Sequence, residues 1–179
     1  MRQFLDKFYW SCSVIASIFI VLICIIVLIQ VVFNVIDKLA ALITGMAIGF
    51  VLPSYAEFAG YLLAASMSFA LADTLKSGSH IRVTLITQKM SARQFWFSEI
   101  FAHVVGLFLS IFFAYWAFHL VYDSFRFNDL SPGIVPVPIW IPQLSMALGV
   151  AALAVCFADQ LVSTFVGRTE NTSSNSSVE

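Results

Sequence analysis

The chain has 179 residues, of which 60% are hydrophobic and only 11% are charged, and its mean hydropathy is +0.93. A soluble domain carries about a quarter charged residues, so this composition excludes an ordinary soluble protein and indicates an integral membrane protein. The net charge of −1 says little by itself, because the distribution of charge matters more than its sum in a membrane protein. We expect no nucleic-acid partner.

The first apolar stretch covers residues 10–33 and is long enough to cross a bilayer, which takes about 20 helical residues. Arg2 and Lys7 precede it, and no small-residue cleavage site follows, so we interpret it as a retained signal anchor. Residues 39–52 are apolar but too few to span comfortably. They are interpreted as an interfacial helix or as a thickened connection between helices.

Three further spans are predicted at residues 55–75, 97–122 and 139–166. The second follows Pro53-Ser54, a pair suited to a helix start. The fourth follows the proline-rich stretch SPGIVPVPIWIP, whose prolines do least harm before a helix and in its first turn. Residues 1–168 therefore form one all-α domain of four transmembrane helices, and the polar residues 169–179 are predicted to be a disordered cytoplasmic tail.

The distribution of Lys and Arg predicts the orientation, since these residues favour the cytoplasmic side. With four spans and a cytoplasmic N-terminus, two of the nine lie outside, Lys38 and Arg126. The other seven lie inside: Arg2, Lys7, Lys76, Arg82, Lys89, Arg93 and Arg168. Counting residues 39–52 as a fifth span would reverse this bias. We therefore predict a multi-pass protein of the bacterial inner membrane with both termini in the cytoplasm.

Small residues recur every fourth position in two spans, a pattern typical of helix contact surfaces in membranes. The second span carries Ala56, Gly60, Ala64, Ser68 and Ala72, and the third carries Ser98, Ala102, Gly106, Ser110 and Ala114. Each set is expected to form a flat ridge that packs inside a four-helix bundle or docks another membrane subunit. The candidate contact residues are Glu57, Gly60, Ala64, Ser68, Ala102, Gly106 and Ser110.

The middle turns of all four predicted spans lack ionisable residues, which argues against an ion or proton path through this chain alone. Glu57 lies in a first helical turn, where the helix dipole favours a carboxylate, or it contacts a partner. Glu99 and His103 share one helix face, but no third metal ligand is evident. The histidines and cysteines suggest neither a haem nor a metal site, and no catalytic motif is found. We expect no enzyme activity and no cofactor.

Residues 76–93 hold a cluster of charge between the second and third spans. On a helical wheel their apolar residues spread over one broad half, which favours an amphipathic segment lying in the membrane interface, although an extended piece also fits. Arg82 and Lys89 fall within that half and would reach phospholipid headgroups. The full set assigned to the headgroup or cytoplasmic interface is Lys76, His80, Arg82, Lys89 and Arg93.

The stretch EFAGYLLAASMSFALADTLKSGSHIRVTLI, residues 57–86, resembles the core signature of the DctQ family, the small membrane subunits of TRAP transporters. The matching residues are Glu57, Gly78, His80, Ile81 and Val83. VPVPIWIPQLSMALG is similar to the family's approach to the fourth span. The family commonly has an Asp just after the Val, whereas Thr84 stands next to Val83 here.

The resemblance implies a non-catalytic scaffold subunit that anchors a large transport subunit, with substrate delivered by a periplasmic binding protein. The transported substrate would be an organic acid, either a carboxylate such as sialic acid or a C4-dicarboxylate, or a sulfonate, taken up with sodium. The alternative is a small four-span assembly or regulatory protein with no transport role.

Overall fold

The structure, a computed structural model, describes residues 2–45, 49, 51–76 and 92–176, without the side chains of residues 2–4, 44, 92 and 166–176. Regular structure in these ranges is helical, with a single β-bridge between Leu130 and Pro138. The helices are α1 (Arg2–Thr44), α2 (Tyr55–Lys76), α4 (Ala92–Phe127) and α5 (Trp140–Ser176).

All four helices are long and apolar enough to cross a membrane. This confirms the predicted all-α class with four spans. Residues 39–44 are the last turns of α1. The helix passes Asp37 and Lys38 without a break, because charge marks the edge of the hydrocarbon layer but does not end a helix. At 43 residues, α1 is about 64 Å long and outreaches a hydrocarbon core of about 30 Å.

The C-terminal helix continues beyond its predicted span. Residues 169–176 are helical as part of α5, and their side chains lie outside the described part of the chain. The disordered tail expected from residue 169 stays a prediction. The interfacial segment expected between the second and third spans falls on residues 77–91, which lie outside the described residues.

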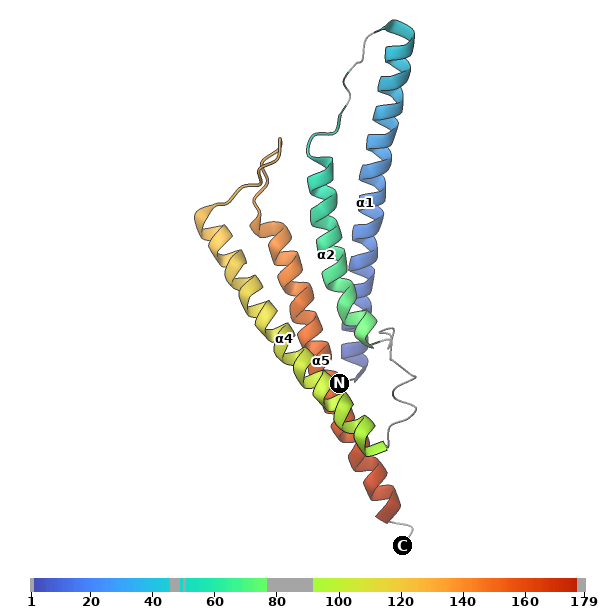
Figure 1. Cartoon of the computed structure of the whole chain (residues 1–179), viewed down its shortest axis with the longest axis vertical. Coiled ribbons are helices and arrows are strands. Elements are labelled where there is room, and N and C mark those ends of the chain that lie inside the picture. The colour runs from blue at the N-terminus through green and yellow to red at the C-terminus, as the bar shows by residue number, and fades with distance from the viewer. Residues whose placement is uncertain (1, 46–48, 50, 77–91, 177–179) are drawn as a thin grey trace.

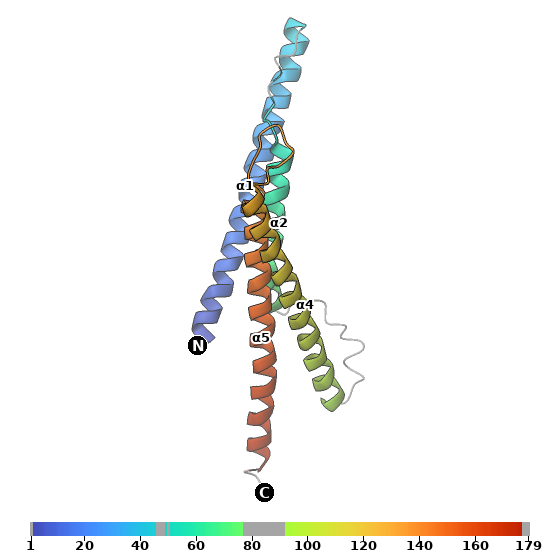
Figure 2. The same ribbon diagram turned by 90° about the vertical axis from the view of Figure 1, so that its left-hand side faces the viewer.

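The helices stand in a row and do not close into a bundle. Packing joins α1 to α2, α2 to α5 and α5 to α4 (Figure 1). In the view turned by 90° the row is seen edge-on, with α1 and α4 leaning in opposite directions (Figure 2). In the most apolar stretch of each helix, 22% of the residues are buried in α2 and α5, but 11% in α1 and 6% in α4. The outer helices α1 and α4 are therefore the open edges of the row.

Helix α1 meets its neighbours through a heptad-like seam. Steps of three and four residues alternate along a line of buried or half-buried side chains: Tyr9, Cys12, Ala16, Phe19, Ile23, Ile26 and Gln30. This spacing keeps one narrow face toward a partner helix that crosses at a small angle. The Ser66 hydroxyl of α2 donates a buried hydrogen bond of 3.0 Å to the Ala16 carbonyl. Helices in lipid gain little hydrophobic free energy by pairing, so hydrogen bonds of this kind between helices help to hold them together.

Helices α1, α2 and α5 converge at the end of the row where α1 begins, here called the closed end. Its core consists of Tyr9, Cys12, Ala72, Ala152 and Cys156. Tyr9 is fully buried, and the Cys156 thiol lies 3.3 Å from the Ala72 carbonyl oxygen, to which it donates. Four small side chains share this core with one large ring, and Leu5, Phe69 and Leu75 pack against it, so the three helix backbones come close together.

The described residues of the first connection (45, 49 and 51–54) and the second connection (128–139) lie at the opposite end, here called the loop end (Figure 1). Gly45 has φ of +73° and ends α1, with its N–H bonded to the Ala41 carbonyl. Asn128 ends α4 in the same left-handed region, with φ of +54°. The second connection is a tight hairpin in which buried Ser131 donates its N–H to Val137 and accepts the Val137 N–H on its hydroxyl.

Candidate functional site

The small residues of α2 divide into a covered and an open part. Ser68 and Ala72 are buried and Ala64 is half-buried. A Cβ added to Gly149 of α5 would lie 2.6 Å from the backbone of Ser68, so the two backbones touch here. Gly60, in contrast, is exposed, and a Cβ there would meet no atom within 4 Å. The closed-end half of the line packs α5, and the loop-end half stays uncovered.

The small residues of α4 also divide into a covered and an open part, but here the open residues lie toward the closed end. Ser110 is buried, and Gly106 lies directly against the Phe157 ring of α5, so any side chain there would displace the ring. Ser98 and Ala102 are exposed. Only part of the predicted line therefore contacts the neighbouring helix.

The geometry of the α-helix explains the division. A step of four residues overshoots one full turn by about 40°, so five residues at this spacing wind through about 160°. A straight neighbour contacts a narrower strip, which alternates steps of three and four. The predicted residues that the row leaves uncovered, Gly60 and Ala102, are free to contact another molecule. Whether they do so stays a prediction.

Glu57 stands in the first turn of α2, as the sequence indicates. Its carboxylate accepts a hydrogen bond of 3.0 Å from the Tyr61 hydroxyl and contacts Gly133 at the tip of the second connection. Ser54, expected to cap α2, uses its hydroxyl oxygen to accept the Val135 N–H at 3.1 Å. Both side chains thus tie the start of α2 to the hairpin between α4 and α5.

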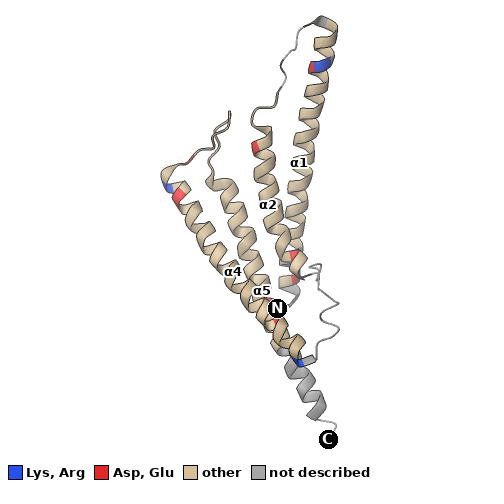
Figure 3. Cartoon of the chain, viewed as in Figure 1, with Lys and Arg blue, Asp and Glu red and all other residues tan. Residues whose placement is uncertain are grey.

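The charged residues assigned to the membrane interface are partly described. Lys76 ends α2 and forms an ion pair with Asp6 of α1; its ammonium also lies 5.2 Å from the centre of the Tyr9 ring. Arg93 is exposed in the first turn of α4. His80, Arg82 and Lys89 fall outside the described residues. Charged residues lie toward the ends of the apolar spans and leave long uncharged stretches between them (Figure 3).

The two described histidines lie in different surroundings on α4. The His103 ring lies 6.4 Å from the Phe157 ring, centre to centre, and its Nδ1 atom is buried without a hydrogen-bond partner in the described part of the chain. His119 contacts Asp123 one turn away at 3.0 Å. Among the described residues no group of three His, Cys, Asp or Glu side chains is placed to hold a metal ion.

Sequence reasoning missed a polar stripe on the loop-end half of α1. The Gln30 carbonyl oxygen accepts the Leu52 N–H at 2.9 Å, while its amide donates to Asn34 at 3.0 Å. One turn on, Asp37 accepts the Gly49 N–H at 2.6 Å. The signal was available, because the spacing 30, 34, 37 places three polar side chains on one face of an otherwise apolar helix.

Comparison with models of known protein families gives a match to this chain. The model of the family described as tripartite ATP-independent periplasmic transporters, DctQ component, matches residues 46–167, more than half of the chain. The match covers α2, α4 and most of α5 and begins just after α1. No curated protein and no solved structure matches the chain.

Proposed function

This chain belongs to the DctQ family, the small membrane components of TRAP transporters, and from that premise we propose that it is a non-catalytic scaffold. In this role it anchors the large transport subunit in the bacterial inner membrane. A periplasmic binding protein delivers the substrate, which is an organic acid, either a carboxylate such as sialic acid or a C4-dicarboxylate, or a sulfonate. Uptake is coupled to sodium.

The observation that carries the scaffold role is the open row of helices. The described helices form a row whose broad faces and outer edges are left largely uncovered by the described residues, and the uncharged middles of the spans suit contact with lipid or another membrane protein (Figure 3). A transport path needs polar groups at bilayer depth. The large subunit would supply that path, while this chain widens the part of the complex that stays fixed.

The arrangement of the helix ends supports a cytoplasmic location for both termini. Helix α1 begins and α5 ends at the same end of the row (Figure 1). The described cations at that end include Lys7, Lys76 and Arg93, whereas Lys38 and Arg126 lie toward the loop end. A reporter enzyme that is active only in the cytoplasm should be active when it is fused after Glu179, whereas a reporter that is active only in the periplasm should not.

The decisive experiment separates folding from assembly. Gly60→Leu and Ala102→Leu place a bulky side chain on open parts of α2 and α4, so the chain alone should keep its thermal midpoint. We expect at least one of them to reduce co-purification of the large subunit and sodium-driven uptake of an organic acid by tenfold or more. Gly106→Leu, which collides with Phe157, is the control that damages the chain itself.

Two outcomes would contradict the proposal. If both open-face variants assemble and transport like the wild type, these small-residue surfaces do not contact the large subunit. If the wild-type chain co-purifies with no large membrane subunit, and its removal leaves uptake intact, the chain is an assembly or regulatory protein outside transport.

A further inference from the structure

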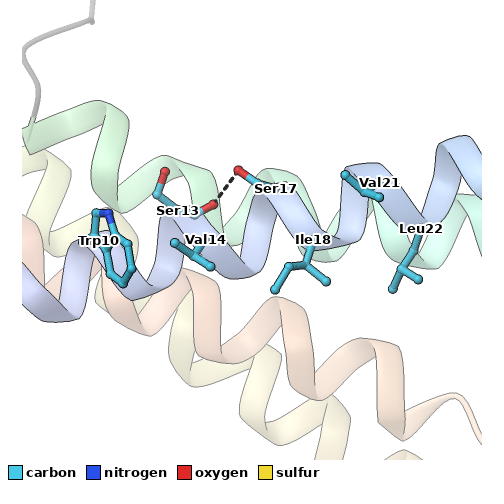
Figure 4. A pocket seen from close by; sticks show the side chains of 7 residues that line it. All are labelled: Trp10, Ser13, Val14, Ser17, Ile18, Val21 and Leu22. Carbon is cyan, nitrogen blue, oxygen red and sulfur yellow. Dashed lines mark hydrogen bonds between the residues drawn. The ribbon is translucent and has the colours of Figure 1, made fainter.

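An open groove of about 330 Å³ runs along α1 on the closed-end half of the helix. Figure 4 shows that it lies between two rows of side chains. One row runs at every fourth residue from Trp10 to Leu22, and the other runs from Ser13 to Val21. The first row is bulky and the second begins with two serines, so less side-chain volume borders the groove at Ser13 and Ser17.

The groove walls are apolar and their few polar groups are already satisfied. The Ser17 hydroxyl donates to the Ser13 carbonyl at 2.9 Å within the same helix. Trp10 and Ile18 are 68% and 52% exposed, so no other part of the described chain covers the groove. The twelve helical steps from Trp10 to Leu22 give it a length of about 18 Å. Its occupant must therefore be long, narrow and apolar.

A positive charge stands at one end of the groove. Lys7 lies one turn before Trp10 on the same face of α1 and is exposed. Its neighbour Asp6 is neutralised by Lys76, and Lys7 forms no ion pair among the described side chains. Trp10 itself is the residue type that membrane proteins place at the level of the headgroups. From the N-terminus onward, α1 thus presents a cation (Lys7), then an interfacial aromatic residue (Trp10), and then the apolar groove.

We propose that this groove binds one acyl chain of an anionic phospholipid, with the lipid phosphate on the Lys7 ammonium. The order of the groups matches the order in a phospholipid, where an anionic phosphate is followed by the ester region and the hydrocarbon. The serine pair gives the chain room beside the helix, and the row from Trp10 to Leu22 forms the opposite wall. The proposal needs only that α1 spans a membrane and does not rest on the transport role.

A helix of another protein is the competing occupant. It would be favoured by side chains that offer hydrogen bonds across the contact, as Ser66 does toward Ala16. In the groove the Ser17 hydroxyl is turned back on its own helix, and the uncompensated Lys7 at its end favours an anionic headgroup. Lipid is therefore the occupant that the contacts favour.

The test uses the full chain in vesicles of phosphatidylethanolamine and phosphatidylglycerol. A small share of the phosphatidylglycerol carries a photoreactive diazirine in one acyl chain. After irradiation, peptide mass spectrometry should find Val14, Ile18 and Leu22 labelled at least threefold more than Ile15 and Ile20. The latter two are exposed on α1 at the same depth but lie outside the groove. Equal labelling of the two sets would overturn the proposal.

Two variants and a matched control sharpen the test. Ser17→Leu fills the groove and should lower labelling of Ile18 to the level of Ile20, while Ser11→Leu, on exposed α1 surface outside the groove, should change nothing. Lys7→Gln should lower groove labelling about fivefold, the factor that one cation near an anionic surface contributes. Retained labelling in both Ser17→Leu and Lys7→Gln would refute the site. Loss of groove labelling when the large subunit is bound would assign the groove to a protein helix.

Discussion

The two ends of the row are held together by different kinds of contact. At the closed end, three helices meet directly around Tyr9, and small residues such as Ala72 and Ala152 let their backbones approach. At the loop end, the connections join the helices through hydrogen bonds between backbone N–H groups and side chains. Gln30 accepts from Leu52, and Ser54 accepts from Val135.

The difference shows how a row of helices can be held by a small core at one end and by hydrogen-bonded connections at the other. Close packing needs small residues on facing helices, and those that pack beside Tyr9 lie at the closed end. Where exposed Gly60 and Ala56 face no neighbour, polar side chains on α1 and α2 hold the connections in place. We infer that the closed end carries most of the stability and that the loop end sets the spacing between the α1–α2 pair and the α4–α5 pair.

Removing the ring at the centre of the closed end should have the largest effect. Tyr9→Ala deletes a fully buried aromatic side chain and should lower the free energy of unfolding by about 3–5 kcal/mol, as aromatic deletions from packed cores do. Tyr115→Ala, a deletion at a site 63% exposed on the edge helix α4, is the control. Denaturant titration of the detergent-solubilised chain measures both. A similar loss for the two variants would mean that the closed end is not the core.

Adding a methyl group where α2 and α5 touch should have the next largest effect on stability. In Gly149→Ala the new methyl group lies 2.6 Å from the Ser68 backbone, which cannot move without shifting α2. The expected loss is about 1–3 kcal/mol, the range for overpacking. Gly60→Ala makes the same change where no atom lies within 4 Å and should be nearly neutral. If the thermal midpoint fell equally in both variants, the result would contradict a direct backbone contact between α2 and α5.

The loop end is tested by Gln30→Leu. The leucine keeps the volume but leaves the Leu52 N–H without its partner, which should cost about 1–3 kcal/mol at a buried position. Hydrogen exchange should quicken at Leu52 and leave the α2 turns near Ala72 protected. If exchange at Ala72 quickened as much, the two ends would unfold as one unit and the distinction between them would fail.

The sequence was sufficient to predict the helices. The α2 boundaries lie within one residue of the prediction, because Pro53-Ser54 and the charges after Leu75 mark both ends. Helix α1 extends beyond the predicted span 10–33, because hydropathy reports the edge of the membrane and the helix continues through Asp37.

The order of the helices could not be predicted from the same signals. Small residues indicate that a face makes contact but not with which neighbour, so both bundle packing and subunit docking stayed open. The seam on α1 escaped notice because Phe19, Ile23 and Ile26 look like every other apolar residue of a lipid-facing helix. Only its polar members break that uniformity, and Gln30 together with Asp37 would have indicated which face the first connection covers.

The smallest effect is expected at the ion pair between Asp6 and Lys76. Both side chains are partly exposed, at 55% and 32%, and water weakens such a pair to about 0.2–1 kcal/mol. A double-mutant cycle with Asp6→Asn and Lys76→Gln should give a coupling energy in this range that shrinks as salt is raised, because ions screen exposed charges. The cycle is needed because Lys76 also lies over the Tyr9 ring, so its single variant removes two interactions. A coupling energy well above this range, unchanged in high salt, would show that the pair is shielded from water and belongs to the closed-end core. A small coupling energy would mean that Tyr9 and its small neighbours are the contacts that hold that end.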